Sequence, residues 1–428
     1  MTEESHENFN NLDNFELKND ESCCKKKACI IITSITILII LLATAGVLYF
    51  FIFKDKCETG EEEKCLSSTK KDCASCNPGY KLSRGKCIIV YYIKAEYYTE
   101  EVGEINLIRD NHIYEITELI IDGETIEPCV KYTFNSTGKH KVYFKMDIDK
   151  VNTQWTLQGL FEGNGNVTSI SFSPLFNTGS VNFMNYMFAY CKSLTSVNIS
   201  SFNTTNVTDM SSMFKGAGSI ETVDLSNFNF ENLYTMDYIF EYSNVKFVNV
   251  SNNNAPKLQR LLRGFANCPS LTSVDFHNFN APALVILEQT FQNSFSLKEV
   301  DFTNFYTENL GYLANTFHNC TSLKSIEINS FNVTSTHYAY YMFYNCTSLT
   351  SVNLQNFNLG IDKNNMQNMF YECPNITYID ISSFWNISST VKLFNALPPK
   401  GEIIVDSSFI DVVRDQIPTG WKKIIIEN

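Results

Sequence analysis

The sequence predicts an α/β repeat solenoid of about ten rungs with a parallel sheet along one face, and two columns of residues support this prediction. A phenylalanine recurs every 24 to 27 residues, which indicates repeated structural units. These phenylalanines are Phe161, Phe188, Phe214, Phe240, Phe265, Phe291, Phe317, Phe343, Phe370 and Phe394. Nine residues after most of them stands a valine or isoleucine, and another apolar residue follows two positions later. Such alternation is typical of a short strand with one buried face.

Each unit therefore contains one strand and one return segment. In the return segment, apolar residues such as Val207, Met210 and Phe214 stand at helical spacing, which predicts a short helix or turn. One rung cannot bury its apolar face alone, so neighbouring rungs must stack. We expect a slab of about ten rungs over residues 151–405 and a C-terminal cap over residues 406–428.

The repeated phrase also carries a family resemblance. The stretch MFAYCKSLTSVNISSFNTTNVTDM at 187–210 resembles the BspA-like leucine-rich repeats of surface proteins from anaerobic bacteria and single-celled eukaryotic parasites. The resemblance covers about residues 151–428. It implies a leucine-rich-repeat horseshoe or slab and a protein-binding or adhesive role at the cell surface, and it supplies no catalytic residue.

Residues 28–53 predict a transmembrane helix. This segment has 26 residues without a charge, and at about 1.5 Å per residue it is long enough to cross a hydrocarbon core of about 30 Å. Aromatic residues rather than a cleavage site follow it, which favours an uncleaved signal-anchor. Lys25, Lys26 and Lys27 flank its N-terminal end, so the positive-inside rule predicts a type II, single-pass plasma-membrane protein with an extracellular C-terminal part.

Residues 1–27 form a short cytosolic tail in this topology. The tail is polar and acidic without apolar periodicity, so we expect it to be disordered. Cys23 and Cys24 lie at the membrane edge, where palmitoylation and free thiols are equally weighted alternatives.

A cysteine-rich stalk follows the membrane segment over residues 54–88. Its C-x-x-C-x-x-G-Y pattern resembles part of an EGF-like or growth-factor-receptor module, which disulfides hold together. The cysteines assigned to disulfides are Cys57, Cys65, Cys73, Cys76, Cys87 and Cys129, and a pairing between chains is the alternative for the odd thiol of the stalk. A redox or zinc site is a weaker alternative, because no second C-x-x-C or histidine pair completes it.

Short β-rich runs occupy residues 89–150 and are separated by turn signals such as Asp122-Gly123. A solenoid needs a cap over its first open face, so we assign these runs to a small N-terminal cap.

Another group of cysteines shares one column of the repeat with small residues, which predicts buried free thiols. These are Cys191, Cys268, Cys320, Cys346 and Cys373.

The chain contains eleven N-x-[ST] sequons, and nine of them are candidate glycosylation sites. Two others, Asn198 and Asn249, fall on predicted strands, where a glycan would obstruct the sheet face. The nine candidates are Asn135, Asn166, Asn203, Asn206, Asn319, Asn332, Asn345, Asn375 and Asn386.

The outward residues of the strands predict a ligand-binding face. Outward positions alternate with the buried columns, and many of them carry a carboxylate, which suits a basic partner. Aromatic residues among them are candidate anchors. The candidate ligand-binding residues are Asp224, Phe247, Asp275, Glu299, Asp301, Glu327, Tyr378 and Asp380. A face that is merely soluble is the strong alternative.

Charge and motifs exclude other classes of function. The formal net charge of −13 argues against a nucleic-acid partner, which requires clustered Lys and Arg. The six histidines lie on different units and no catalytic motif appears, so we expect no enzyme, cofactor or metal site. The sequence favours a cell-surface glycoprotein that binds a protein or matrix ligand, and a structural coat protein without a specific ligand is the alternative.

Overall fold

The computed structural model describes residues 65–68, 73–76, 80–83, 86–89, 91–146, 156–174, 176, 178–328, 330–331, 333, 338–357, 366–384 and 392–427. The chain divides into two compact units, Met1–Ile89 and Val90–Asn428. The predicted tail and transmembrane segment, with Cys23 and Cys24, lie outside the described residues, as do Cys57, Asn332 and Asn386. Within the described ranges, no helix is long and apolar enough to span a membrane.

The first unit contains two antiparallel strand pairs. Strand β1 (Cys65–Ser68) pairs with β2 (Cys73–Cys76), and β3 (Tyr80–Ser83) pairs with β4 (Lys86–Ile89). The register of the first pair sets Cys65 opposite Cys76. Cys129 of the other unit is a free, half-buried thiol and does not supply the suggested sixth disulfide cysteine.

The second unit begins with an antiparallel sheet. Strand β5 (Tyr91–Thr99) pairs with β10 (Gly138–Met146), which pairs with β7 (Ile116–Ile121) and then β8 (Glu124–Ile126). Strands β6 (Gly103–Asn106) and β9 (Lys131–Phe134) form a second ribbon, and a 3-10 helix, η1 (Asp110–Glu115), precedes β7. On its other side β5 pairs with β11 (Val167–Phe172), the first strand of the repeats. The edge of the first rung is therefore hydrogen-bonded rather than open.

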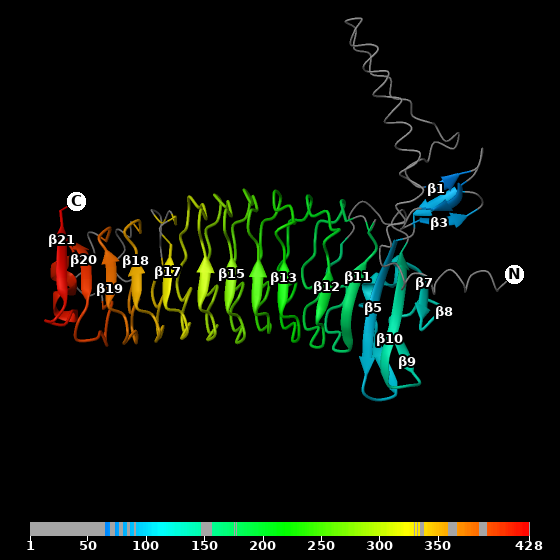
Figure 1. Ribbon diagram of the computed structural model, residues 1–428, viewed down its shortest axis with the longest axis horizontal. Coiled ribbons are helices and arrows are strands. Elements are labelled where there is room, and N and C mark those ends of the chain that lie inside the picture. The colour runs from blue at the N-terminus through cyan, green and yellow to red at the C-terminus, as the bar shows by residue number, and fades with distance from the viewer. Residues whose placement is uncertain are drawn as a thin grey trace, which may run out of the picture. The chain divides into compact units, whose positions relative to one another are not determined.

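The repeats form a parallel β-solenoid of about eight turns with little helix (Figure 1). After β11 its strands are β12 (Ser196–Asn198), β13 (Thr222–Asp224), β14 (Phe247–Asn249), β15 (Ser273–Asp275), β16 (Glu299–Asp301), β17 (Ser325–Glu327), β18 (Ser351–Asn353), β19 (Tyr378–Ile381), β20 (Glu402–Asp406) and β21 (Lys422–Ile426). The middle residue of most three-residue strands is buried and its neighbours are not, as the alternation predicted. The hydrogen-bonded ladder breaks after β12 and after β16, so the predicted single long sheet is three sheets.

The predicted phenylalanine column forms the centre of the core. All ten side chains stack in sequence, with centroid distances of 5.2 to 6.2 Å between successive rings. The ring planes of most pairs are nearly parallel, because each rung repeats the backbone of the last with a small rotation. Stacked, fully buried rings contribute both apolar area and ring contacts to each rung interface.

The return segments are not helices, so the α/β class was wrong, and the leucine-rich-repeat horseshoe is not confirmed. Many return segments carry residues in the left-handed region four positions apart, such as Gln289 at φ 55° and Asn293 at φ 60°. Backbone N–H groups there alternate between a tight turn and the next rung: Thr290 N donates to Leu287 O at 3.3 Å, and Phe291 N to Thr316 O at 2.8 Å. This pattern buries the same residues as a helix would, because a left-handed residue at every fourth position turns the chain so that the same side chains face the core.

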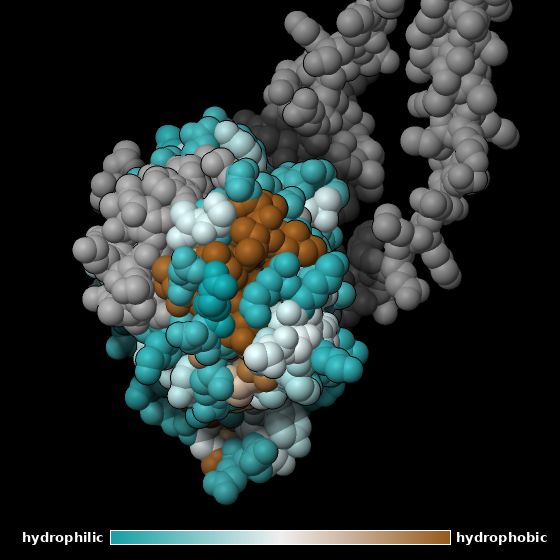
Figure 2. Space-filling model, turned by 90° about the vertical axis from the view of Figure 1, so that its left-hand side faces the viewer, coloured by the Kyte–Doolittle hydropathy of each residue, from teal (hydrophilic) through white to brown (hydrophobic). Residues whose placement is uncertain are grey.

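The C-terminal end carries the short helix α2 (Ile410–Val413), the 3-10 helix η3 (Arg414–Gln416) and the edge strand β21. Ile410, Val413 and Trp421 are buried there. Figure 2 shows apolar surface gathered at this end of the solenoid, and Ile425 of β21 is 51% exposed.

Candidate ligand-binding surface

Carboxylates at the strand ends have a structural task in the turns. Oδ1 of Asp224, Asp275 and Asp301 accepts the N–H two residues further along, at 2.9, 2.8 and 2.8 Å. Asn249 and Asn353 make the same contact at 3.0 Å. This local bond turns the chain out of the strand, which explains why Asp and Asn recur in the column.

Five of the eight predicted ligand-binding residues line one open depression on the strand face, with a volume of about 690 Å³. Asp275 comes from β15, Glu299 and Asp301 from β16, and Glu327 from β17. Phe247 of β14 lies at the same depression and is 37% exposed. The depression spans the break between β16 and β17, where Asp301 and Glu327 occupy equivalent positions of neighbouring strands.

The other three predicted residues do not join this group. Asp224 is exposed on β13, two strands before β15, and Tyr378 is half-buried on β19. Asp380 is only 5% exposed, and its Oδ1 accepts Ser382 N at 3.0 Å. Its register neighbour on β20 is Ile404, a bulky apolar residue. Asp380 therefore does not face a ligand, and its assignment to the binding face was wrong.

The depression is strongly negative. The described residues of its lining include four carboxylates and no lysine or arginine. Hydrogen bonds from the side chain and backbone of Thr303 lower the pKa of Asp301, and His277 adds to this effect, so Asp301 stays ionised at neutral pH. No group of three or more metal-ligating side chains is positioned to hold an ion anywhere in the described ranges. Carboxylates that are spread over three strands suit an extended cationic segment better than a single ion.

The cysteine column is buried and free, as predicted. Sγ of Cys320, Cys346 and Cys373 donates to the carbonyl oxygen of a phenylalanine in the previous rung, at 3.2, 3.1 and 3.0 Å. Burial raises the pKa of Cys191 and Cys268 to about 12. Their thiols are therefore protonated over the whole neutral range.

We expect the column thiols to resist iodoacetamide at pH 8 in the folded protein and to react once the chain is unfolded in urea. The thiolate is the reactive form, and with a pKa near 12 it is present in only about one molecule in ten thousand at pH 8. The half-buried Cys129 should react first among the described free cysteines. Mass spectrometry of alkylated peptides measures this, and modification of Cys346 as fast as Cys129 would contradict it.

The sequons differ in whether their amide nitrogen is available. Asn345 Nδ2 donates to Asn319 Oδ1 at 2.9 Å, and Asn319 Nδ2 donates to Asn293 Oδ1 at 2.7 Å, so a glycan on either would break an asparagine ladder. Asn166, Asn206 and Asn375 also donate through Nδ2, to backbone oxygens. The exposed residues Asn135 and Asn203 are better glycosylation sites, since no hydrogen bond from their Nδ2 occurs among the described residues.

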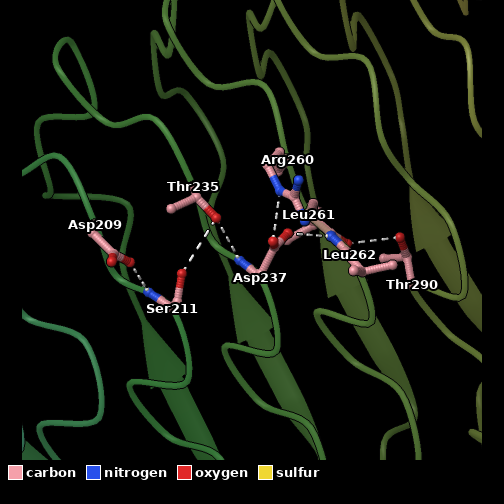
Figure 3. A network of polar contacts seen from close by, with 8 residues as sticks. All are labelled: Asp209, Ser211, Thr235, Asp237, Arg260, Leu261, Leu262 and Thr290. Carbon is pink, nitrogen blue, oxygen red and sulfur yellow. Dashed lines mark hydrogen bonds and ion pairs between the residues drawn. The ribbon is translucent and has the colours of Figure 1, made fainter.

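The return segments carry a polar network that the sequence reasoning did not identify (Figure 3). Asp237, 7% exposed, accepts Arg260 Nε and Leu262 N at 2.7 Å each. Glu241, one turn further on, contacts Lys215 and Arg263 at 2.7 Å each.

A family model described as "Mycoplasma protein of unknown function, DUF285" matches residues 156–279 and 259–384. The two matches overlap and together cover most of the solenoid, and more than half of the 428-residue chain. Comparison with curated proteins gives no match.

Proposed function

The chain belongs to the family described as Mycoplasma protein of unknown function, DUF285, and on this premise we propose that it is a recognition protein whose solenoid binds a basic segment of a protein or matrix ligand. The binding site is the acidic depression formed by β14 to β17. The function is binding rather than catalysis, and it needs no cofactor.

One observation carries this proposal: four carboxylates and the half-exposed ring of Phe247 lie around a single depression, and the described residues that line it include no lysine or arginine. Concentrated negative potential attracts a basic segment and speeds its encounter. An exposed aromatic ring at the rim supplies the apolar anchor that such interfaces use.

In this role the solenoid lies outside the cell. The uncharged segment 28–53 would anchor the chain as a type II plasma-membrane protein, and the BspA-like resemblance implies adhesion to host, matrix or neighbouring cells. Sequons such as Asn203 would then be glycosylated.

A structural coat is the second candidate, and the strand-end turns favour it. Each Asp or Asn of the column is already explained by its bond to the N–H two residues on. Glu299 of β16 is not explained in this way, because no turn bond to its side chain occurs among the described residues. This additional carboxylate at β16 therefore favours recognition.

We expect the Asp275→Lys, Asp301→Lys and Glu327→Lys triple variant to lose the partner that the wild-type protein captures from matrix and cell-surface proteins. Reversing three of the four charges turns attraction of a basic segment into repulsion. The measurement is saturable capture on immobilised protein, compared with and without enzymatic removal of N-glycans.

The matched control reverses three exposed carboxylates elsewhere: Glu124→Lys, Glu231→Lys and Asp415→Lys. It has the same net charge as the test variant and should retain binding. Equal capture by both variants would mean that the partner does not bind at the depression. The absence of any saturable partner in either glycoform would favour the structural coat.

A further inference from the structure

A second surface lies on the return segments, away from the strands. Six tyrosines of three consecutive rungs gather there and are called the tyrosine surface. They are Tyr312, Tyr338, Tyr340, Tyr341, Tyr344 and Tyr371. Neither the depression nor the repeat pattern uses them, since each stands at a return-segment position that varies between rungs.

Ring contacts connect the whole tyrosine surface. Tyr338 contacts Tyr312 at 5.5 Å and Tyr340 at 6.0 Å between centroids. Tyr341 contacts Tyr340 at 5.8 Å and Tyr344 at 5.5 Å, and Tyr344 stacks on Tyr371 at 5.7 Å. Rings that hold one another in place lose little further freedom when a ligand binds, so the surface is preorganised.

The rings are presented to solvent rather than buried in the core. Tyr338 is 42% exposed, and the other five are partly exposed. Half-exposed tyrosine rings offer a negative π face and a wide apolar contact area, which are the properties of an interaction surface.

Glu288 adds a carboxylate beside this surface. Isolated parallel β-bridges join Ile286 to Tyr312 and Tyr312 to Tyr338, so these three residues occupy equivalent positions in consecutive rungs. Glu288 follows Ile286 by two residues, just as Tyr340 follows Tyr338. Ala314, which has a small side chain, occupies the equivalent position in the rung between Glu288 and Tyr340. The pKa of Tyr340 is raised by burial and then by the negative charge of Glu288, so the two groups are close enough to act on one ligand.

No described residue compensates Glu288. The equivalent residue two rungs earlier, Asp237, has Arg260 at 2.7 Å (Figure 3), and Glu241 has two cations. Glu288 makes no ion pair or side-chain hydrogen bond within the described ranges, and partial burial raises its pKa. A partly desolvated carboxylate without a partner is costly, and a ligand cation would remove that cost.

We propose that the tyrosine surface and Glu288 bind an arginine-bearing segment of a partner protein, with a guanidinium lying on a tyrosine ring and donating to the Glu288 carboxylate. Arginine fits better than lysine, because its planar group both stacks on an aromatic face and donates two parallel hydrogen bonds. This site is separate from the acidic depression and does not depend on it.

The test uses the purified full chain and two labelled peptides, (Arg-Gly)4 and (citrulline-Gly)4, in a fluorescence anisotropy titration. Citrulline keeps the planar shape of arginine and lacks its charge. We expect the arginine peptide to bind at least about tenfold more tightly than the citrulline peptide. Equal affinities would overturn the proposal.

Variants then locate the site. Glu288→Gln preserves shape, and we expect it to weaken binding of the arginine peptide by about five- to tenfold. Tyr340→Ala with Tyr341→Ala should weaken it at least as much, whereas Tyr234→Ala, a 46% exposed tyrosine outside this group, should have no effect.

The triple variant Asp275→Lys, Asp301→Lys and Glu327→Lys separates this site from the depression. Retained binding by the triple variant, together with loss in Glu288→Gln, supports the proposal. If the triple variant loses the peptide while Glu288→Gln and the tyrosine variant keep it, the peptide binds the depression and the tyrosine surface is not its site. Circular dichroism of each variant establishes that the fold is kept.

Discussion

Replacing Phe291 by alanine should lower the free energy of unfolding by about 3–5 kcal/mol. Phe291 is 1% exposed and stacks between Phe265 at 5.4 Å and Phe317 at 5.3 Å. Its loss removes apolar burial, two ring contacts and the support of both neighbouring rungs. Because solenoid stability is a sum over rungs and their interfaces, one cavity in the middle weakens both interfaces.

The control for Phe291 is Phe295→Ala, which removes a phenylalanine of the same rung that is 47% exposed. We expect this change to be within about 0.5 kcal/mol of the wild type. Urea denaturation followed by circular dichroism gives both values. Similar small changes for the two variants would contradict the stacked phenylalanine core.

Replacing Glu241 by glutamine should also destabilise the protein strongly. The Glu241 side chain is 3% exposed, and its two carboxylate oxygens contact Lys215 and Arg263 at 2.7 Å each. Glutamine leaves both cations without a counter-charge. Removing one member of a buried pair costs roughly 3–5 kcal/mol, and we expect the lower end because the cations are 20% and 29% exposed.

Asp411→Asn is the matched control for Glu241→Gln. Asp411 pairs with Arg414 at 2.6 Å, but the two side chains are 81% and 59% exposed. A solvent-exposed pair contributes at most about 1 kcal/mol, so the unfolding midpoint should barely move. If the two variants shifted the midpoint equally, the ion pairs of Glu241 with Lys215 and Arg263 would contribute no more to stability than an exposed pair.

The core of this fold could be predicted from the sequence because it depends on periodicity. Phe291 and its equivalents recur at a nearly constant interval, and the strand residues alternate, so both were placed correctly. The helix prediction failed because Val207, Met210 and Phe214 have the spacing of a helix and of this turn alike. A distinguishing signal was present: Asn293 and Asn319 stand where the chain needs a left-handed residue, which asparagine tolerates well.

The binding face was only partly predictable. Outward strand positions follow from alternation, which is why Asp275, Asp301 and Glu327 were found together. Asp380 is buried at a strand position opposite Ile404, and alternation along its own strand does not report this neighbour. The tyrosine surface was missed because only strand positions were considered as outward. The run YAYY at 338–341 was its signal.

Zero-length carbodiimide cross-linking of the wild-type protein to its captured partner would test recognition by the acidic depression most directly. This reagent joins a carboxylate to a contacting lysine, and mass spectrometry identifies both residues. Recognition at the depression predicts that Glu299, Asp301 or Glu327 is joined to lysines of the partner. Cross-links confined to carboxylates outside the depression, such as Glu231 or Glu427, would contradict it.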